Sequence, residues 1–371
     1  WFLAPAFKAA ITALTAPIAL AVAEVIVNVL TCAATEKRPL PHLSERYIPK
    51  SANACITYTR LISSVAEAKD AIFMLETVAA ANPGERFSYA LLADLPSAAE
   101  DKIAADDEII DYLKREFSRL NGDKFNILVR NRSFLKEKNC YQGWERKRGA
   151  LCDFNGLILR GETAPFRIIL GRSFAAKYVV ALDSDTLLNC ADDLTALMEH
   201  PYNRAVNVAS MNVRTDPASS EKTQFAGLFS GATGFDSYSC ACESNSELFG
   251  RGNYTGKGIY RVKEFDEAVG KAFPDGRILS HDFIEGAYAG ARNCDEIALD
   301  STPTSFSLWL RRRLRWLRGD WQLLPWLCPI VSSKNGKLRK NSISAIDKWH
   351  IFMGLIFTLS EACSLALIIF A

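Results

Sequence analysis

Long apolar runs lie near both ends of the chain. The first covers residues 9–34 with Glu24 as its only charge, and the second covers 349–371. Each run is long enough to cross the hydrocarbon core of a bilayer, so we predict transmembrane helices at 1–35 and 349–371. A buried helix of a soluble protein is the alternative interpretation of each run.

Basic residues flank both apolar runs on the side that faces the middle of the chain. They are Lys37, Arg38, Arg46 and Lys50 after the first run, and Lys334, Lys337, Arg339, Lys340 and Lys348 before the second. Positively charged segments next to membrane helices stay on the cytoplasmic side. We therefore predict that the intervening domain, 45–345, is cytoplasmic.

Between the apolar runs, short β-rich stretches alternate with helical patterns. The strands are predicted at 54–61, 87–93, 125–129 and 177–182, and the helices at 64–81 and 98–120. This alternation predicts an α/β fold with a doubly wound, Rossmann-type sheet. Ligands of such sheets bind at the carboxyl ends of the strands, so the residues directly after each strand are the first candidates for a site.

Composition narrows the function only slightly. With 371 residues, 49% of them hydrophobic, the chain can bury one large core or two ordinary ones. Its 44 lysines and arginines nearly balance 42 aspartates and glutamates, which argues against a nucleic-acid partner. The 10 cysteines are scattered, and Cys240-Ala-Cys242 has poor spacing for a redox pair or a zinc knuckle, so we expect reduced, mostly buried thiols.

Acidic residues follow two of the predicted strands. Asp183-Ser184-Asp185 comes directly after 177–182, and two carboxylates at a strand end suit Mg²⁺ or Mn²⁺, which would bind a diphosphate. An acidic surface turn is an equal alternative. Asp94 follows 87–93 and could accept hydrogen bonds from a base or ribose, or simply cap a turn before Pro96.

Two segments combine glycines with cations. In 143–150, Lys147 lies in a basic run at the start of an apolar helix, which suits an anionic diphosphate or, equally, a solvated basic turn. In 251–260, three glycines surround Lys257 without the spacing of a P-loop or a dinucleotide fingerprint. We interpret the second segment as an acceptor or substrate loop, with a surface turn as the alternative.

The segment 278–286 places Asp282 and Glu285 three residues apart, on one helical face if it is helical. Asp282, beside His281, is a candidate general base for a sugar hydroxyl. A helix capped by Ser280 with acidic first-turn residues would produce the same pattern, and the pattern alone favours the cap.

The segment 308–326 is rich in tryptophan and arginine. Arg312, Arg315 and Trp316 share one helical face and offer guanidinium groups for phosphate and an indole for a sugar ring. A basic amphipathic helix at a membrane surface has the same composition. The two interpretations are compatible if they concern different faces.

In their order along the chain, these motifs resemble the processive membrane glycosyltransferases of the cellulose synthase type. The resemblance runs from about Leu40 to the C-terminus. Four strings are similar in particular to the glycosyltransferase region of cyclic β-1,2-glucan synthases: 143–151, 254–260, 278–282 and 315–326.

The resemblance implies a glycosyltransferase-A-like sheet, flanking membrane helices and an amphipathic interface helix near 305–327. It implies these site residues: Asp94 at the nucleoside, Asp183 and Asp185 at the metal and diphosphate, Asp282 as catalytic base, and Arg312, Arg315 and Trp316 in place of the family's Gln-x-x-Arg-Trp signature. The chain departs from the family pattern at two places. Arg312 replaces the leading Gln of the signature, and Ser280-His281-Asp282 replaces the family's Thr-Glu-Asp.

The implied enzyme is an inverting, processive glucosyltransferase that transfers glucose from UDP-glucose to a growing β-1,2-glucan. The resemblance places it in a bacterial inner membrane as a multi-pass protein in contact with the lipid bilayer. Since the chain opens at Trp1 and stops within an apolar run, we expect it to be a piece of a larger polypeptide. The resemblance implies that the full enzyme has further membrane helices and a large periplasmic, glycoside-phosphorylase-like portion. The alternatives are a synthase for another sugar or linkage, and a catalytically silent subunit that guides glycan.

Overall fold

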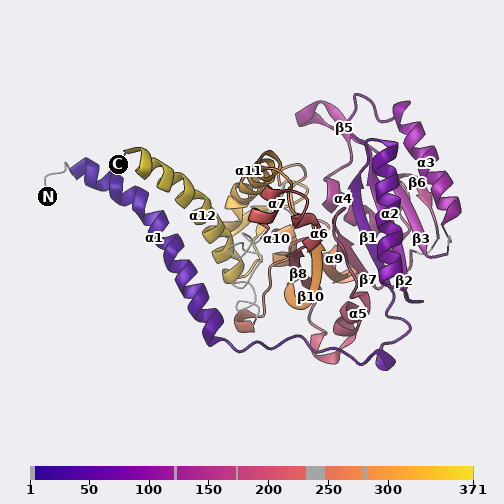
Figure 1. Ribbon diagram of the computed structural model, residues 1–371, viewed down its shortest axis with the longest axis horizontal. Helices are drawn as coiled ribbons and strands as arrows, with labels where there is room; N and C mark the ends of the chain where they lie inside the picture. Colours follow the sequence, from indigo (N-terminus) through magenta and orange to yellow (C-terminus); the bar gives the residue numbers. More distant parts are fainter. Residues whose placement is uncertain (1–4, 121–122, 173, 231–246, 279–281, 371) are drawn as a thin grey trace.

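The computed structural model of the protein describes residues 5–120, 123–172, 174–230, 247–278 and 282–370. A large sheet carries helices on both faces, and two long helices from the ends of the chain lie together at one side of it (Figure 1). The predicted α/β class and the large central sheet are confirmed.

Within the described residues, eight strands form one sheet in the order β10-β8-β9-β7-β1-β2-β3-β6. Their bounds are β1 Ala54–Leu61, β2 Phe87–Asp94, β3 Phe125–Arg130, β6 Phe166–Leu170, β7 Tyr178–Leu182, β8 Val208–Thr215, β9 Gly258–Arg261 and β10 Arg292–Asp300. The pairs β7-β1, β1-β2, β2-β3 and β8-β10 are parallel. β9 runs antiparallel to β7 and β8, and β6 antiparallel to β3, so the sheet is mixed rather than uniformly doubly wound.

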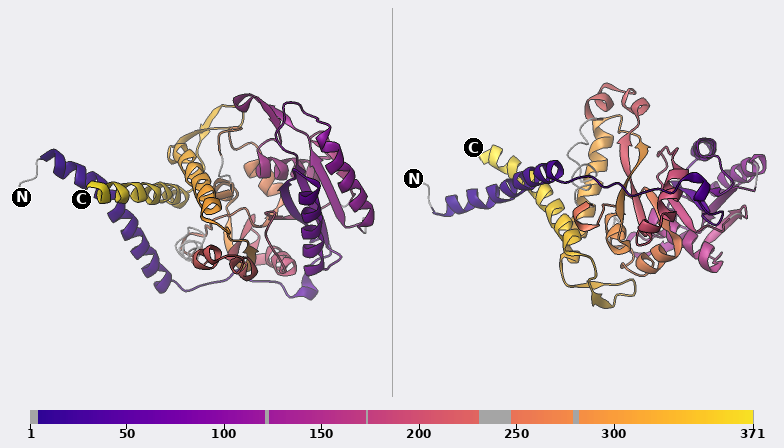
Figure 2. Two further views of the ribbon diagram at one scale, coloured as in Figure 1. Left: turned by 45° about the horizontal axis from the view of Figure 1, so that its top comes forward. Right: turned by 90° about the horizontal axis from the view of Figure 1, so that it is seen from below.

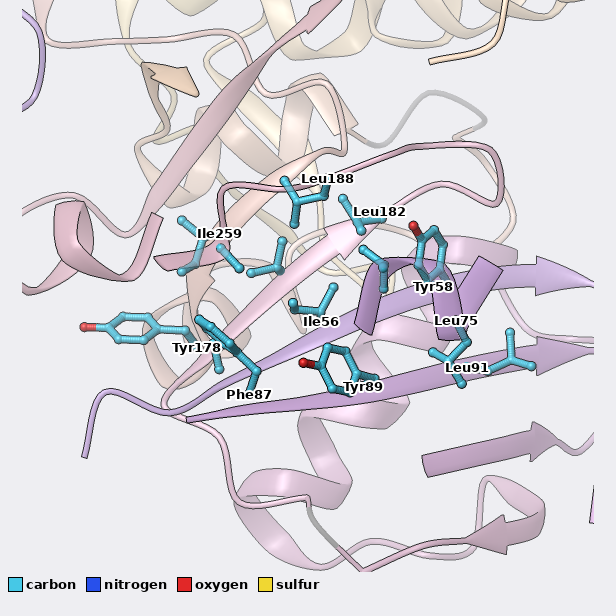
Figure 3. Close-up of a cluster of buried hydrophobic side chains, with 14 of the residues drawn as sticks. Ile56, Tyr58, Leu75, Phe87, Tyr89, Leu91, Tyr178, Leu182, Leu188 and Ile259 are labelled. Carbon is cyan, nitrogen blue, oxygen red and sulfur yellow. The ribbon is translucent and has the colours of Figure 1, made fainter. Parts of the chain in front are cut away.

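Helices cover the two faces of the sheet as separate groups. The helices on one face are α2 Val65–Ala81, α3 Ala105–Arg119 and α5 Ala191–Glu199, and those on the other are α4 Arg146–Arg160, α9 Val262–Val269 and α10 Asp282–Ala289. Side chains alternate between the two cores along each strand: Ile56 joins the first group and Cys55 the second. Figure 3 shows the first core, where Leu75 of α2 lies near Tyr58 and Leu91.

Several further elements complete this body. They are the helices α6 Pro217–Ser220, α7 Gln224–Phe229 and α11 Phe306–Gln322, and the two-stranded pairs β4 Ser133–Leu135 with β5 Cys140–Gln142 and β11 Ile330–Ser332 with β12 Leu338–Lys340. The prediction that a helix begins at Ala98 is wrong. Ala98 exchanges backbone hydrogen bonds of 2.9 and 2.8 Å with Tyr141, and this bridge delays the start of α3 to Ala105.

Two helices are long and apolar enough to cross a membrane, α1 Pro5–Ala34 and α12 Ala345–Phe370. They contact each other, and both views in Figure 2 show them crossing outside the sheet. The indole Nε1 of Trp349 donates a hydrogen bond of 3.2 Å to the Glu24 carboxylate.

The cysteines in the described residues are free thiols. Cys55, Cys294 and Cys363 are buried, whereas the other five are partly or fully exposed, so the expectation of mostly buried thiols is wrong. Cys240 and Cys242 lie outside the described residues.

Candidate active site

Four charged side chains meet at the carboxyl edge of the sheet, and we call them the lysine cluster: Lys147, Asp183, Lys257 and Asp300. Lys147 Nζ lies 2.5 Å from Asp183 Oδ1, and Lys257 Nζ lies 2.7 Å from Asp183 Oδ2. Lys257 also contacts Asp300 Oδ2 at 2.8 Å, and its side chain is only 8% exposed. Asp183 is thus held between two cations from different parts of the chain.

The topology of the sheet explains how these residues meet. Asp183 directly follows β7, and Asp300 ends β10, which runs in the same direction as β7. Because β9 runs the other way, its first residue rather than its last lies at this edge. Lys257, just before β9, therefore reaches the carboxylates, while Lys147 reaches them from the first turn of α4.

Asp183 and Lys257 are held in their charged forms. Desolvation would raise the pKa of Asp183, but the charges of Lys147 and Lys257 outweigh it and hold that pKa well below its usual range. Desolvation likewise works against charge on Lys257, yet Asp183 and Asp300 raise its pKa. The cluster therefore presents two lysine cations at the site of the predicted diphosphate.

Asp185 lies beside this cluster, and no cation among the described residues forms an ion pair with its carboxylate. It is exposed, and within the described part of the chain it makes no hydrogen bond or ion pair. Desolvation, then the negative charges of Asp300 and Asp183, raise its pKa. Such crowding is relieved when a cation binds.

The donor chemistry fits Mg²⁺ or Mn²⁺ as part of a diphosphate complex. Mg²⁺ in such sites takes one or two carboxylates, and substrate phosphates and water supply the remaining ligands. Among the described residues, no three His, Cys, Asp or Glu side chains form a cluster that could hold a metal by themselves. Asp185 offers free oxygens, whereas Asp183 would have to share its oxygens with the lysines.

Asp282 lies next to the lysine cluster across a glycine. Gly256 has φ 76°, and a Cβ at this position would lie 2.7 Å from the Asp282 carboxylate. The carbonyl oxygen of Gly256 accepts a hydrogen bond of 2.7 Å from Lys147 Nζ. A side chain at residue 256 would therefore collide with Asp282, so glycine permits the close approach.

The two acids of α10 differ in access to solvent. Asp282, the first residue of the helix, is partly exposed and makes no hydrogen bond or ion pair within the described ranges. Glu285 is 2% exposed and lies in the core. Ser280 and His281, the predicted cap and the neighbour of the candidate base, lie outside the described residues.

Asp94 belongs to a second group, the arginine cluster: Asp94, Arg130 and Asp153. Arg130 donates to both oxygens of Asp94, at 2.7 and 2.8 Å, and to Asp153 at 2.9 Å. Its side chain is 1% exposed, whereas that of Asp94 keeps 12% exposure. Asp94 therefore lies at the end of β2, as predicted. Both of its carboxylate oxygens are held by Arg130, and only a small part of its side chain is exposed to solvent.

Helix α11 brings one predicted residue toward the site and leaves another at the surface. The Arg312 guanidinium lies over the ring of Trp316, 4.7 Å from its centroid, and donates to the Ser301 carbonyl at 3.5 Å, next to Asp300. Its positive charge acts on Asp185. Arg315 is exposed and forms no hydrogen bond or ion pair with any residue described.

Other side chains of α11 hold it to the terminal helix α12. Arg313 forms an ion pair with Glu361, and Trp321 Nε1 donates a hydrogen bond of 3.0 Å to Thr358. Leu310 and Leu314 are exposed. The Arg312–Trp316 pair and the contacts with α12 thus involve different side chains of one helix, as the two interpretations of its sequence require.

Sequence reasoning missed four residues of these clusters: Lys257, Asp300, Arg130 and Asp153. Lys257 was seen as part of a substrate loop and not as a partner of Asp183, and Asp300 was not singled out. Arg130 directly follows the predicted strand 125–129, so the rule that directs attention to strand ends could have found it.

Comparison with known proteins supports the resemblance. No protein-family model matches the chain. Over 335 residues, the chain is 31% identical to the cyclic β-(1,2)-glucan synthase NdvB of Rhizobium meliloti (strain 1021), a match that covers 83% of this chain. The chain is similar to a segment of a cyclic β-(1,2)-glucan synthase. This confirms the resemblance, and the match spans 11% of the length of that synthase.

Solved structures overlap with the chain only loosely. The mannosyltransferase Ktr4p from S. cerevisiae is 11% identical, with 74% of this chain and 72% of that chain covered and a TM-score of 0.31. The galactosyltransferase LgtC, crystallised with donor and acceptor sugar analogues, is 12% identical, with coverages of 64% and 72% and a TM-score of 0.28. At these TM-scores we draw no conclusion about function from the solved structures.

Proposed function

We propose that the chain is the catalytic segment of a membrane-bound, inverting, processive glucosyltransferase that extends a β-1,2-glucan with glucose from UDP-glucose. The observation that carries the proposal is the meeting of Lys147 and Lys257 on Asp183, with Asp282 beside them across Gly256. A cationic pair and a partly exposed carboxylate side by side are what transfer from a nucleoside diphosphate sugar requires.

The reaction is a single in-line displacement. A hydroxyl of the acceptor glucan attacks the anomeric carbon, its proton passes to the Asp282 carboxylate, and the bond from that carbon to the UDP oxygen breaks. Attack opposite the leaving group converts an α-linked donor into a β-linked product. Lys147 and Lys257 stabilise the negative charge that develops on the departing diphosphate.

In the same proposal, Asp183 and Asp185 would hold Mg²⁺ or Mn²⁺. When bound, the metal ion supplies further charge neutralisation for the diphosphate. Asp94 orients the nucleoside, and Arg312 with Trp316 borders the site on the side of α11. Arg315, exposed on α11, would add a further cation for the diphosphate.

The membrane arrangement belongs to the proposal as well. α1 and α12 span the bilayer of a bacterial inner membrane, the domain 45–345 is cytoplasmic, and α11 lies at the interface with Leu310 and Leu314 toward lipid. Further membrane helices and a periplasmic portion would complete a larger polypeptide. Labels at Lys37 and Lys337 should both react from the cytoplasmic side, and reaction from opposite sides would contradict this topology.

Turnover of UDP-glucose by the purified full-length protein tests the proposal. We expect release of UDP together with formation of a glucan, and linkage analysis of that product should give β-1,2 bonds. UDP-galactose and UDP-N-acetylglucosamine are the matched donors for comparison. Turnover of one of these instead, or another linkage, would indicate a different polysaccharide synthase, and no turnover of any donor would favour a silent glycan-guiding subunit.

A further inference from the structure

Arg130 uses every hydrogen-bond donor that an arginine has. Besides its three bonds to Asp94 and Asp153, it donates from Nη1 to the Trp144 carbonyl at 2.9 Å and from Nη2 to the Arg146 carbonyl at 3.0 Å. A guanidinium group carries five N–H donors, so none is left for a ligand. The role of Arg130 must therefore be sought in the groups that it holds.

One of those groups is a strained turn. Glu145 and Arg146 have φ of 50° and 46°, a left-handed conformation that side-chain-bearing residues rarely adopt in succession. Gly149 packs so closely under the turn that a Cβ there would lie 1.8 Å from the Trp144 carbonyl oxygen. The turn ends directly at Lys147, so the direction in which Lys147 enters α4 depends on it.

The other group is Asp94. Both of its oxygens are fixed by Arg130, and Gly143, at the start of the same turn, approaches so closely that a Cβ would lie 2.5 Å from the Asp94 carboxylate. One buried side chain therefore sets both the carboxylate at the end of β2 and the backbone that delivers Lys147 to Asp183.

We propose that Arg130 is a positioning residue that couples the nucleoside end of the donor site to its diphosphate end, by holding Asp94 and the Trp144–Arg146 turn in one arrangement. The inference rests on the proposed function, because it takes Asp94 and Lys147 as donor-binding residues. Without the guanidinium, the strained carbonyls lose their donors, and Lys147 is no longer constrained to meet Asp183.

Binding of two probes to the full-length protein in detergent separates this role from a general role in folding. Uridine tests the nucleoside end alone, and UDP tests both ends. In Arg130→Gln we expect UDP affinity to fall by about tenfold to a hundredfold, with a smaller fall for uridine. Arg130→Lys should not restore UDP binding, since an ammonium has three donors and cannot form the fork to Asp94.

A double-mutant cycle tests whether Arg130 acts through Lys147. In the Lys147→Met background, Arg130→Gln should weaken UDP binding only as much as it weakens uridine binding. Additive losses in UDP affinity would overturn the inference. Equal losses for uridine and UDP in Arg130→Gln alone would overturn it too.

Arg132 provides the matched control. Its side chain is also 1% exposed and forms a double contact with Asp106, at 2.7 Å for each oxygen. Its other hydrogen bonds go to the carbonyl oxygens of Pro96 and Asp101 and not to the turn. Arg132→Gln should lower thermal stability yet keep the ratio of UDP to uridine affinity of the parent. If Arg130→Gln fails to fold, the same ratio is measured in Arg130→Lys, which keeps the buried positive charge.

The parent protein distinguishes this inference from the proposed function. Absence of UDP binding by the parent would overturn the proposed function and the inference with it. Normal UDP binding by the parent, with unchanged ratios in the Arg130 variants, would overturn the inference alone.

Discussion

The arginine cluster and the lysine cluster share one edge of the sheet but differ in how completely their charges are satisfied. In the arginine cluster, one guanidinium uses all its donors, and both oxygens of Asp94 are paired. In the lysine cluster, Asp183 is paired twice, but Asp185 and Asp282 beside it make no hydrogen bond or ion pair within the described residues.

This difference suggests that the arginine cluster positions its neighbours, whereas the reaction takes place beside the lysine cluster. Arg130, with all five N–H donors used, has none left for a ligand, whereas carboxylates that have no partner among the described residues and lie next to fixed cations can bind a cation or exchange a proton. We therefore expect substitutions beside the lysine cluster to affect the rate, and substitutions in the arginine cluster to affect binding and stability.

The largest effect is expected at Asp185. Asp185→Ala should reduce glucose transfer to below about a thousandth of the parent rate, because the free carboxylate needed for the metal–diphosphate complex is gone. Transfer assays with UDP-glucose measure this loss, and EDTA should produce it in the parent. Asp295→Ala, which removes an exposed carboxylate elsewhere, is the control. Activity that persists in EDTA would rule out the metal.

Asp282 should show the next largest effect. Asp282→Asn is nearly isosteric but cannot accept the proton of the acceptor, so transfer should fall about a hundredfold or more while UDP-glucose still binds. Glu285→Gln is the control, since Glu285 is 2% exposed and lies in the core. A near-normal rate in Asp282→Asn with a collapsed rate in Glu285→Gln would assign the base to Glu285.

Two tryptophans of α11 allow a comparison of its contacts. Trp316 pairs with Arg312 on the side of the site, and Trp321 contacts Thr358 of α12. Trp316→Ala should lower polymer synthesis about tenfold and leave membrane association intact. Trp321→Ala should leave polymer synthesis near the parent level and lower the Tm of the protein in detergent, because the hydrogen bond from α11 to Thr358 of α12 is lost. Flotation with lipid vesicles measures membrane association of both variants. Loss of membrane association in Trp316→Ala alone would favour the purely interfacial interpretation.

The smallest effect concerns stability at the open site. The lowered pKa of Asp183 means that its charge stabilises the fold above its unfolded-state pKa of about 3.9, and this contribution is lost as pH falls through the native pKa. The raised pKa of Asp185 has the opposite sign: its charge costs stability above the native pKa, and this cost disappears below about pH 3.9.

At pH 7, Asp183→Asn should therefore lower the Tm and Asp185→Asn should raise it, each by about 3 °C. Asp185→Asn should converge with the parent as the pH falls to about 4. Asp183→Asn should converge with it only at still lower pH, where Asp183 of the folded parent becomes protonated. Thermal scans of the protein in detergent at a series of pH values measure both trends. A Tm that falls equally in both variants would show that the two carboxylates are in equivalent environments.

The parts of the fold that depend on local pattern were predictable. β1 spans the predicted residues, and Asp94 and Asp183 lie at strand ends, because apolar β-branched runs and the polar residues that end them are adjacent in sequence. The start of α3 was not predictable, because Ala98 forms a β-bridge with Tyr141, and no local sequence pattern indicates that partner.

Lys257 shows why the lysine cluster was harder to predict. The strand-end rule assumes parallel strands, and it therefore searches after each strand. Lys257 precedes β9, and only the antiparallel direction of β9 brings the residue before it to the carboxylates. The direction of one strand in a mixed sheet depends on pairing across the whole domain, which the surrounding glycines do not reveal.

The hydrogen bond from Trp349 to Glu24 has a consequence for the order of synthesis. Glu24 lies within the apolar helix α1, where Asn28, one turn further on, donates to the same oxygen at 3.4 Å. If α1 enters a bilayer as the ribosome produces it, Glu24 has only this neighbour until α12 is translated, after the whole sheet. The contact between α1 and α12 would then form only after the domain between them has been synthesised. The pair of membrane helices is therefore completed no earlier than the enzyme domain.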